Sequence, residues 1–151
     1  MKYFRGVGAI IVSEQTGNVM TVLRSPKESY ANTWTFAGGK VEPDETEIDA
    51  LKRELQEELQ LTKIKKITPL HRYQSRAKDF VYDTFVVLVT KEFAPTLNWE
   101  NTGYAWTTID TLPGPLHPKT KQMISSARLV EKFRNFYQWV DNNNGKDNTV
   151  S

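Results

Sequence analysis

Three glutamates are spaced so that they could bind a divalent cation. Glu54, Glu57 and Glu58 stand at i, i+3 and i+4, which places their carboxylates on one face of a helix. Like charges at this spacing repel one another, so the cluster weakens a helix unless a cation offsets the repulsion. Carboxylate oxygens without His or Cys are the ligands that Mg²⁺ or Mn²⁺ prefers. The alternative interpretation is a solvated acidic face, as in most glutamate-rich helices.

An apolar stripe beside the glutamates predicts the helix that carries them. At about 100° per residue, positions three and four apart share one side of a helix. The stripe consists of Ile48, Leu51, Leu55 and Leu59. We expect a helix over residues 46–59, capped by Asp44 or Thr46.

The residues that frame the glutamates are more specific than the glutamates themselves. Residues 39–61 read glycine, five residues, glutamate, seven residues, Arg-Glu, an apolar residue, any residue, and Glu-Glu. This pattern resembles the Nudix box, the signature of a family that hydrolyses nucleoside diphosphates linked to another moiety. The charged positions of the box are all present: Glu45, Arg53, Glu54, Glu57 and Glu58. The resemblance implies a metal-dependent hydrolase with an α/β/α sandwich fold.

One position departs from the family pattern. Gln60 stands where the family has glycine. A left-handed helix end at this point costs a non-glycine residue about 1 kcal/mol or more, so we expect the helix exit to differ from the family norm. Because no charge is lost, we do not interpret the departure as inactivation.

The resemblance also implies a set of metal ligands. Glu54, Glu57 and Glu58 would bind Mg²⁺ or Mn²⁺, joined by the backbone carbonyl of Gly38. We expect Gly38 and Gly39 to form a turn opposite the helix, where glycine allows close approach of the backbone. Gly39 is therefore expected to have a structural role.

Two charged residues of the box are expected to support the ligands. Arg53 lies on a neighbouring helix face, and the resemblance implies that it orients the carboxylates through charge-assisted hydrogen bonds. An ordinary surface salt bridge is the alternative for Arg53. Glu45 is expected to be a structural partner at the head of the helix.

The sequence leaves the general base open between two glutamates. Family members often take a base from a loop outside the box, and Glu100 stands in such a loop just before a predicted strand. A solvated loop carboxylate is the alternative for Glu100. Glu57 is the other candidate, because crowded carboxylates have split pKa values and one could act as a base near neutral pH.

Substrate contacts are predicted from charge and aromatic character. Arg24 at a strand end and Lys40 beside the glycine pair are candidates to bind phosphate, although both could be ordinary exposed charges. Aromatic side chains could stack on a base, although core packing is their commoner role. These candidates are Trp34, Tyr82, Tyr104 and Trp106.

The remaining patterns predict an α/β fold with a mixed sheet between two main helices. Strands are expected over 3–13, 19–24, 64–73, 80–92 and 103–109, with a short extended piece at 34–36. The strand over 64–73 contains Pro69 and should be an edge or bulged strand. The strand over 80–92 is the most apolar and should be central. A long amphipathic helix is expected over 120–140, packed on the sheet.

Composition limits the class of protein. At 151 residues we expect one domain over 1–140, followed by a polar, disordered tail over 141–151. A net charge of +2 does not predict a nucleic-acid or membrane partner. The absence of cysteine fits a cytoplasmic location. Whether the chain forms a homodimer is left open.

The leading hypothesis is a hydrolase of a nucleoside diphosphate derivative such as ADP-ribose, a dinucleoside polyphosphate or a nucleotide sugar. The partner would then be a small nucleotide. One alternative is a catalytically silent nucleotide-sensing module, and the intact box disfavours it. The other is a pyrophosphohydrolase that sanitises damaged nucleoside triphosphates.

Overall fold

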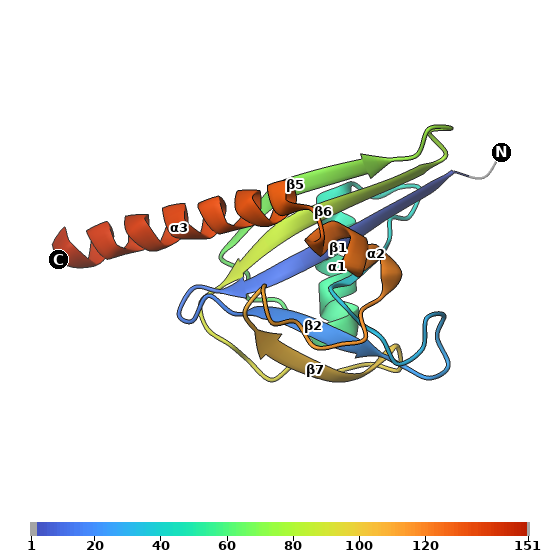
Figure 1. Ribbon diagram of the computed structural model, residues 1–151, viewed down its shortest axis with the longest axis horizontal. Helices are drawn as coiled ribbons and strands as arrows, with labels where there is room; N and C mark the ends of the chain where they lie inside the picture. The colour runs from blue at the N-terminus through green and yellow to red at the C-terminus, as the bar shows by residue number, and fades with distance from the viewer. Residues whose placement is uncertain (1–2, 151) are drawn as a thin grey trace.

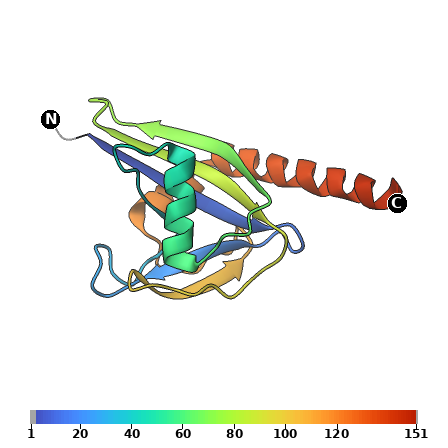
Figure 2. The same ribbon diagram turned by 180° about the vertical axis from the view of Figure 1, so that it is seen from behind.

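The computed structural model describes the backbone of residues 3–150 and the side chains of residues 3–138. A mixed seven-stranded sheet lies between helices (Figure 1). Helix α1 (Glu47–Leu59) covers one face, and α2 (Pro118–Ile124) and α3 (Ala127–Val150) cover the other (Figure 2). The predicted α/β/α sandwich is confirmed. The strands are β1 (Phe4–Ser13), β2 (Val19–Arg24), β3 (Trp34–Thr35), β4 (Ala37–Lys40), β5 (Lys66–Gln74), β6 (Phe80–Val89) and β7 (Asn101–Thr107).

The pairing of β1 organises the sheet. The strand order is β3-β2-β1-β6-β5, with β4 paired to β1 and β7 paired to β2. Strand β1 runs parallel to β6 along its whole length. On its other edge β1 changes partner, because its first half pairs with β4 and Ile11 and Val12 pair with β2. The change of partner brings β4 under α1, and β2 separates from β1 where β4 pairs with it.

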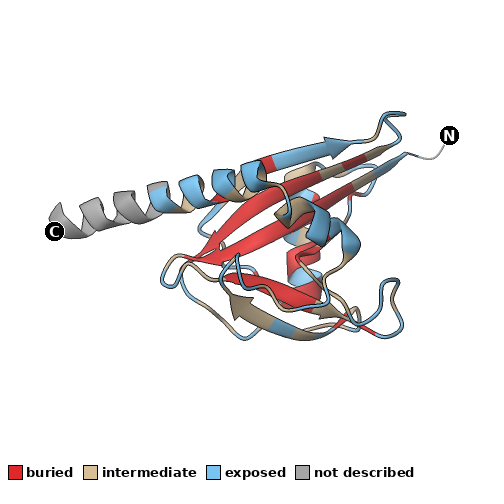
Figure 3. Ribbon diagram, in the orientation of Figure 1, coloured by how far each residue is buried: buried red, intermediate tan, exposed pale blue. Residues whose placement is uncertain are grey.

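Alternation along the strands builds two apolar layers. Val7, Ala9 and Ile11 of β1 face the stripe of α1, and the residues between them face α3. On the α3 side, Phe133 packs against Ile10 and its neighbours. Figure 3 shows that the buried residues concentrate on β1, β6 and β2. The central strands are therefore rigid supports for the groups at their ends.

Most predicted strands are found close to their expected positions. Strand β5 is an edge strand with a register shift between Pro69 and His71, as the proline predicted. Strand β6 is central but ends at Val89, and β7 begins two residues before its predicted start. Thr46 caps α1, since its side chain accepts a hydrogen bond from the Asp49 N–H.

Gly38 and Gly39 do not form the expected turn. They are paired in β4 with Gly8 and Val7 of β1. A Cβ at Gly38 would lie 2.2 Å from the Val7 carbonyl oxygen, and one at Gly39 would lie 2.2 Å from the Glu54 carboxyl carbon. Glycine is required here by close approach in an extended strand, not by turn geometry.

The predicted long C-terminal helix is divided in two. The Ser125 Oγ donates to the Lys121 carbonyl, and the Ser126 Oγ accepts from the Leu129 N–H, so the two serines end α2 and begin α3. Helix α3 continues to Val150, across the segment 141–150 where the composition predicted a disordered tail. The division of the chain at residue 140 stays a prediction.

The exit of α1 keeps the left-handed conformation although the glycine is missing. Gln60 has φ 53° and ψ 34°, and its N–H donates to the Gln56 carbonyl. The expected change in the helix exit is therefore not seen. Within the described part of the chain, no helix is long and apolar enough to cross a membrane.

The close packing of Gly38 yields a stability prediction. Gly38→Ala should lower the free energy of unfolding by about 1–3 kcal/mol, because the added methyl group meets rigid backbone. Denaturant unfolding measures the change. Gly103→Ala is the matched control, because its Cβ would have its nearest contact at 3.6 Å, from the Leu23 Cβ. Equal stability of the two variants would contradict the close packing of β4.

Candidate active site

Two buried carboxylates of α1 point at β4. The Glu58 Oε2 accepts a hydrogen bond of 3.1 Å from the Gly38 N–H, and its Oε1 accepts one of 3.2 Å from the Asn101 side chain. The Glu54 carboxyl group lies against Gly39. The Glu57 side chain, in contrast, is 52% exposed. Glu54 and Glu58 therefore form the inner part of the predicted cluster, and Glu57 its outer part.

Arg53 connects the cluster to the loop before the helix. Its Nε and Nη2 donate to the two Glu45 carboxylate oxygens at 2.7 and 2.8 Å. Its Nη1 donates to Glu54 at 2.9 Å and to Glu57 at 3.3 Å, and Nη2 also donates to the Lys40 carbonyl. The planar guanidinium thus holds three carboxylates and one strand end. The contacts join Arg53 to Glu45 and to two carboxylates of the predicted cluster, and the roles of Arg53 and Glu45 stay predictions.

The pair of Glu45 and Arg53 is charged at every working pH. Hydrogen bonds from Arg53, and then from the Glu42 backbone N–H, lower the pKa of Glu45 to about 2. Hydrogen bonding to Glu45 in turn raises the pKa of Arg53. The anchor of Arg53 is therefore insensitive to pH in the range where the protein would work.

Glu100 belongs to the same group of charges, although it lies outside the box. It sits directly before β7, and its negative charge raises the pKa of both Glu54 and Glu58. Burial is the largest cause at Glu58, followed by Glu100 and Glu54, and together they raise the pKa of Glu58 to about 9. Three neighbouring carboxylates thus share a site with more negative charge than its donors compensate.

This arrangement fits a hard divalent cation. The Glu54 and Glu58 carboxylates are buried, and the atoms they offer to a metal ion are oxygens. Across the described side chains, however, no three His, Asp or Glu groups converge as a finished metal cage. Protein donors bind one oxygen each of Glu54 and Glu57 and both oxygens of Glu58. The carboxylates are neighbours, but their coordination shell is not assembled.

The predicted phosphate contacts differ in their surroundings. Arg24 is half-buried, and its Nε and Nη2 donate to the Ser29 carbonyl and hydroxyl. Lys40 is exposed at the end of β4, beside the anchor of Arg53. Arg24 therefore ends β2, and its guanidinium is held by the loop that follows, whose Ser25 N–H donates to the Glu100 carbonyl.

The aromatic candidates occupy four different environments. Trp106 donates to the Phe93 carbonyl and packs on the core, so its ring is structural. The Trp34 ring lies beside Gly103, and its backbone bridges to the segment before α2. Tyr104 is 39% exposed on β7, where no ring contact or side-chain hydrogen bond with another described residue involves it. Tyr82 lies next to the glycines of β1.

Sequence reasoning missed several residues at or near the site. Asn101 is buried and hydrogen-bonded to Glu58, and its place directly after Glu100 was the only available signal. At the far end of the sheet, the ammonium group of Lys119 lies 4.0 Å above the ring of Phe80. His117, which received no role, caps α2 by accepting from the Lys119 N–H. No pattern in the sequence announces these contacts across elements.

Comparison with known proteins identifies the family. The NUDIX domain model matches residues 2–127. A CTP pyrophosphohydrolase of Escherichia coli is 49% identical over 59 residues, which cover 39% of this chain and only 42% of that protein. An 8-oxo-dGTP diphosphatase of Haemophilus influenzae is 28% identical over 86% of this chain and 94% of its own. The crystal structure of a MutT NUDIX hydrolase from Burkholderia pseudomallei superposes with a TM-score of 0.64 at 25% identity, covering 84% of this chain and 99% of its own.

The anchor of Arg53 can be tested through cation binding. Arg53 and the Glu42 N–H donate to both carboxylate oxygens of Glu45. In Glu45→Gln one of these oxygens becomes an NH₂ group, which is itself a donor and cannot accept the hydrogen bond. Loss of such a supporting contact should weaken Mn²⁺ affinity about 10- to 100-fold. Electron paramagnetic resonance titration measures the free Mn²⁺. Glu42→Gln, the same charge change three residues earlier, should bind Mn²⁺ as the wild type does. Unchanged affinity in Glu45→Gln would refute the anchor.

Proposed function

The chain belongs to the Nudix family, and we propose that it hydrolyses a nucleoside triphosphate to the monophosphate and pyrophosphate. The observation that supports the reaction is the pair of buried carboxylates, Glu58 bound to the Gly38 N–H and Glu54 against Gly39, with the charge of Glu100 close by. The substrate class rests on the two relatives, which are named for activities on CTP and 8-oxo-dGTP. A triphosphate thus replaces ADP-ribose and similar compounds as the preferred substrate.

A divalent metal ion completes the proposed site. Nudix proteins in general use such ions, and we propose Mg²⁺ or Mn²⁺ for this chain. Glu54, Glu57, Glu58 and the Gly38 carbonyl would hold the ion. When bound, it would lower the pKa of the attacking water and neutralise charge on the phosphate oxygens. Glu54 and Glu57 would each keep one oxygen on Arg53 and offer the other oxygen to the ion.

The protein's own groups position the reactants and move the proton. A carboxylate oxygen of Glu100 takes a proton from the water, whose oxygen forms the new bond to phosphorus while the bond to pyrophosphate breaks. Glu100 is the preferred base because it is close enough to Glu54 and Glu58, the proposed metal ligands, for its charge to act on both. Glu57 is the second candidate, since it is exposed and held by Arg53. Arg24 and Lys40 are the proposed phosphate contacts, and Trp34 and Tyr104 the proposed base contacts.

A substrate panel tests the proposed activity. With Mg²⁺ or Mn²⁺ we expect kcat/KM for CTP, dCTP or 8-oxo-dGTP to exceed that for ADP-ribose by at least about tenfold, which corresponds to 1.4 kcal/mol. Chromatography of the products should show monophosphate and pyrophosphate in equal amounts. Reaction in ¹⁸O-labelled water identifies the phosphorus that is attacked. Binding of nucleotides without turnover by the folded protein would overturn the enzyme proposal and favour a sensing module.

Substitution of the carboxylates tests their roles separately. Glu58→Gln should lower kcat by about 10²-fold or more, the scale of a key electrostatic group. Glu100→Gln should cause a similar loss if Glu100 is the base, whereas a near-wild-type kcat would transfer that role to Glu57. Glu131→Gln, an equal charge change on α3 across the sheet, is the control and should retain full activity. Steady-state kinetics at saturating metal measures all three variants.

A further inference from the structure

Tyr82 occupies space that three glycines leave free. It lies on β6 opposite Gly6 of β1. A Cβ at Gly6 would lie 2.8 Å from the Tyr82 ring, and one at Gly8 would lie 2.4 Å from its hydroxyl oxygen. A Cβ at Gly38 would lie 3.0 Å from the same oxygen. The ring therefore follows β1 over two glycines, and its hydroxyl group ends beside β4.

The hydroxyl group has no hydrogen-bond partner among the described residues. Among the described residues, two side-chain oxygens lack a partner and are completely sealed from solvent, those of Thr21 and Thr68. The Tyr82 oxygen is not among them. The Tyr82 oxygen is therefore not completely sealed from solvent. A buried or half-buried hydroxyl group without a partner is uncommon in folded proteins and needs an explanation.

The Tyr82 hydroxyl group lies beside Gly38, whose N–H donates to Glu58 of the proposed site. Burial raises the pKa of this hydroxyl, the Glu58 and Glu54 carboxylates raise it further, and Arg24 opposes them. The group thus stays protonated and can donate a hydrogen bond. The neighbouring Gly38 N–H is already used by Glu58.

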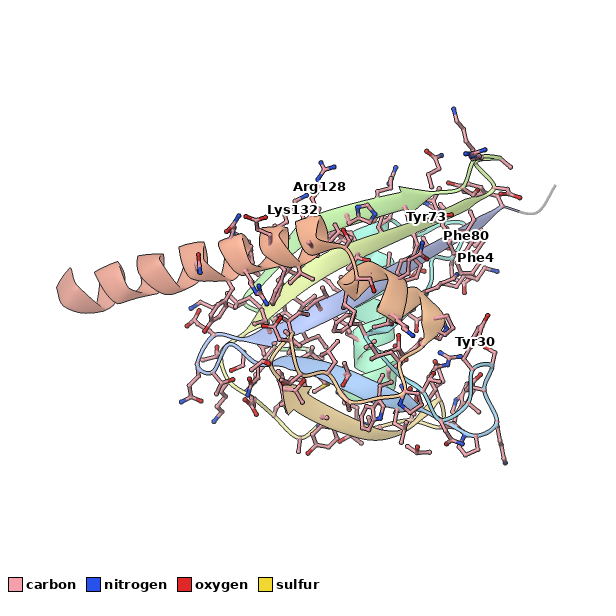
Figure 4. The ribbon with its side chains drawn as sticks, viewed as in Figure 1. Phe4, Tyr30, Tyr73, Phe80, Arg128 and Lys132 are labelled. Carbon is pink, nitrogen blue, oxygen red and sulfur yellow. The ribbon has the colours of Figure 1, made fainter. Side chains whose placement is uncertain are left out.

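We propose that the Tyr82 hydroxyl group donates a hydrogen bond to a phosphate oxygen of the bound nucleotide. This inference rests on the proposed function and adds a residue that positions the substrate. A phosphate oxygen is the preferred acceptor because the donor lies beside Gly38 and the carboxylates, where the reacting phosphate must be. Phe4 and Phe80, near Tyr73 at the end of the sheet, stack on each other with ring centroids 5.0 Å apart (Figure 4), so Trp34 and Tyr104 remain the proposed base contacts.

Tyr82→Phe tests the contact, because it removes the hydroxyl group and keeps the ring over Gly6 and Gly8. Its kcat/KM for the preferred triphosphate should fall about tenfold or more, as expected for a lost hydrogen bond to a charged group. The thermal unfolding midpoint should stay unchanged. With EDTA present, calorimetry should show weaker CMP binding but equal cytidine binding, since cytidine lacks the phosphate.

Tyr73→Phe is the matched control for this experiment. Tyr73 pairs directly with Tyr82 on β5 and is 51% exposed, so loss of its hydroxyl group should change neither kinetics nor CMP affinity. A kcat/KM of Tyr82→Phe within twofold of wild type, in an enzyme that is active, would overturn the inference alone. An equal loss of cytidine and CMP affinity would overturn the phosphate assignment. A wild type that binds and hydrolyses no nucleotide would overturn the proposed function as well.

Discussion

The approach of β4 to α1 is the constraint on which the site depends. Gly38 and Gly39 lie so close to β1 and to the helix that neither position has room for a Cβ. This closeness allows the Gly38 N–H to donate to Glu58 and brings Glu54 against the strand. It is possible only because β1 leaves β2 and pairs with β4 over Gly6 to Ala9. The carboxylates are thus placed by sheet pairing as much as by the helix that carries them.

Burial of these acids is unfavourable, and other parts of the fold offset it. A carboxylate removed from water beside like charges strongly favours its neutral form, which explains the raised pKa of Glu58. Arg53 compensates part of the charge at the helix, and the buried stripe of Leu51, Leu55 and Leu59 holds the helix against the sheet. The remaining charge is what a divalent cation would neutralise. Repulsion between the buried carboxylates therefore makes their charged forms unfavourable without a cation and favours binding of one.

The predictable parts of this structure were those set by local pattern. β-Branched and aromatic content located β1, alternation located β2, and the apolar stripe located α1 with its Thr46 cap. Gly38-Gly39 was misinterpreted because a glycine pair usually signals a turn, whereas here tertiary packing requires it. The break at Ser125 was missed because the apolar stripe continues across it, while the serine hydroxyl groups end the helix locally.

The site was predictable to a similar degree and for similar reasons. The box carries its own spacing, so Glu54, Glu58 and their anchor Arg53 could be named in advance, and Glu100 followed from the family resemblance. Asn101 could not be named, because its contact with Glu58 joins β7 to α1 across 43 positions of sequence. Nor could the hydroxyl end of Tyr82, whose position depends on glycines of two other strands.

The separation between box and non-box residues explains why the box indicates a reaction better than a substrate. Its charged residues lie on α1 and in the loop before it, where Arg53 binds Glu45, Glu54 and Glu57. The groups proposed to contact the nucleotide lie mostly elsewhere: Arg24 at the end of β2, Trp34 on β3, Tyr82 on β6 and Tyr104 on β7. These two sets meet beside Gly38, where Glu58 approaches from the helix and Tyr82 from β6. The proposed substrate contacts and the box thus come from different elements, and the backbone of β4 at Gly38 is a point that both approach.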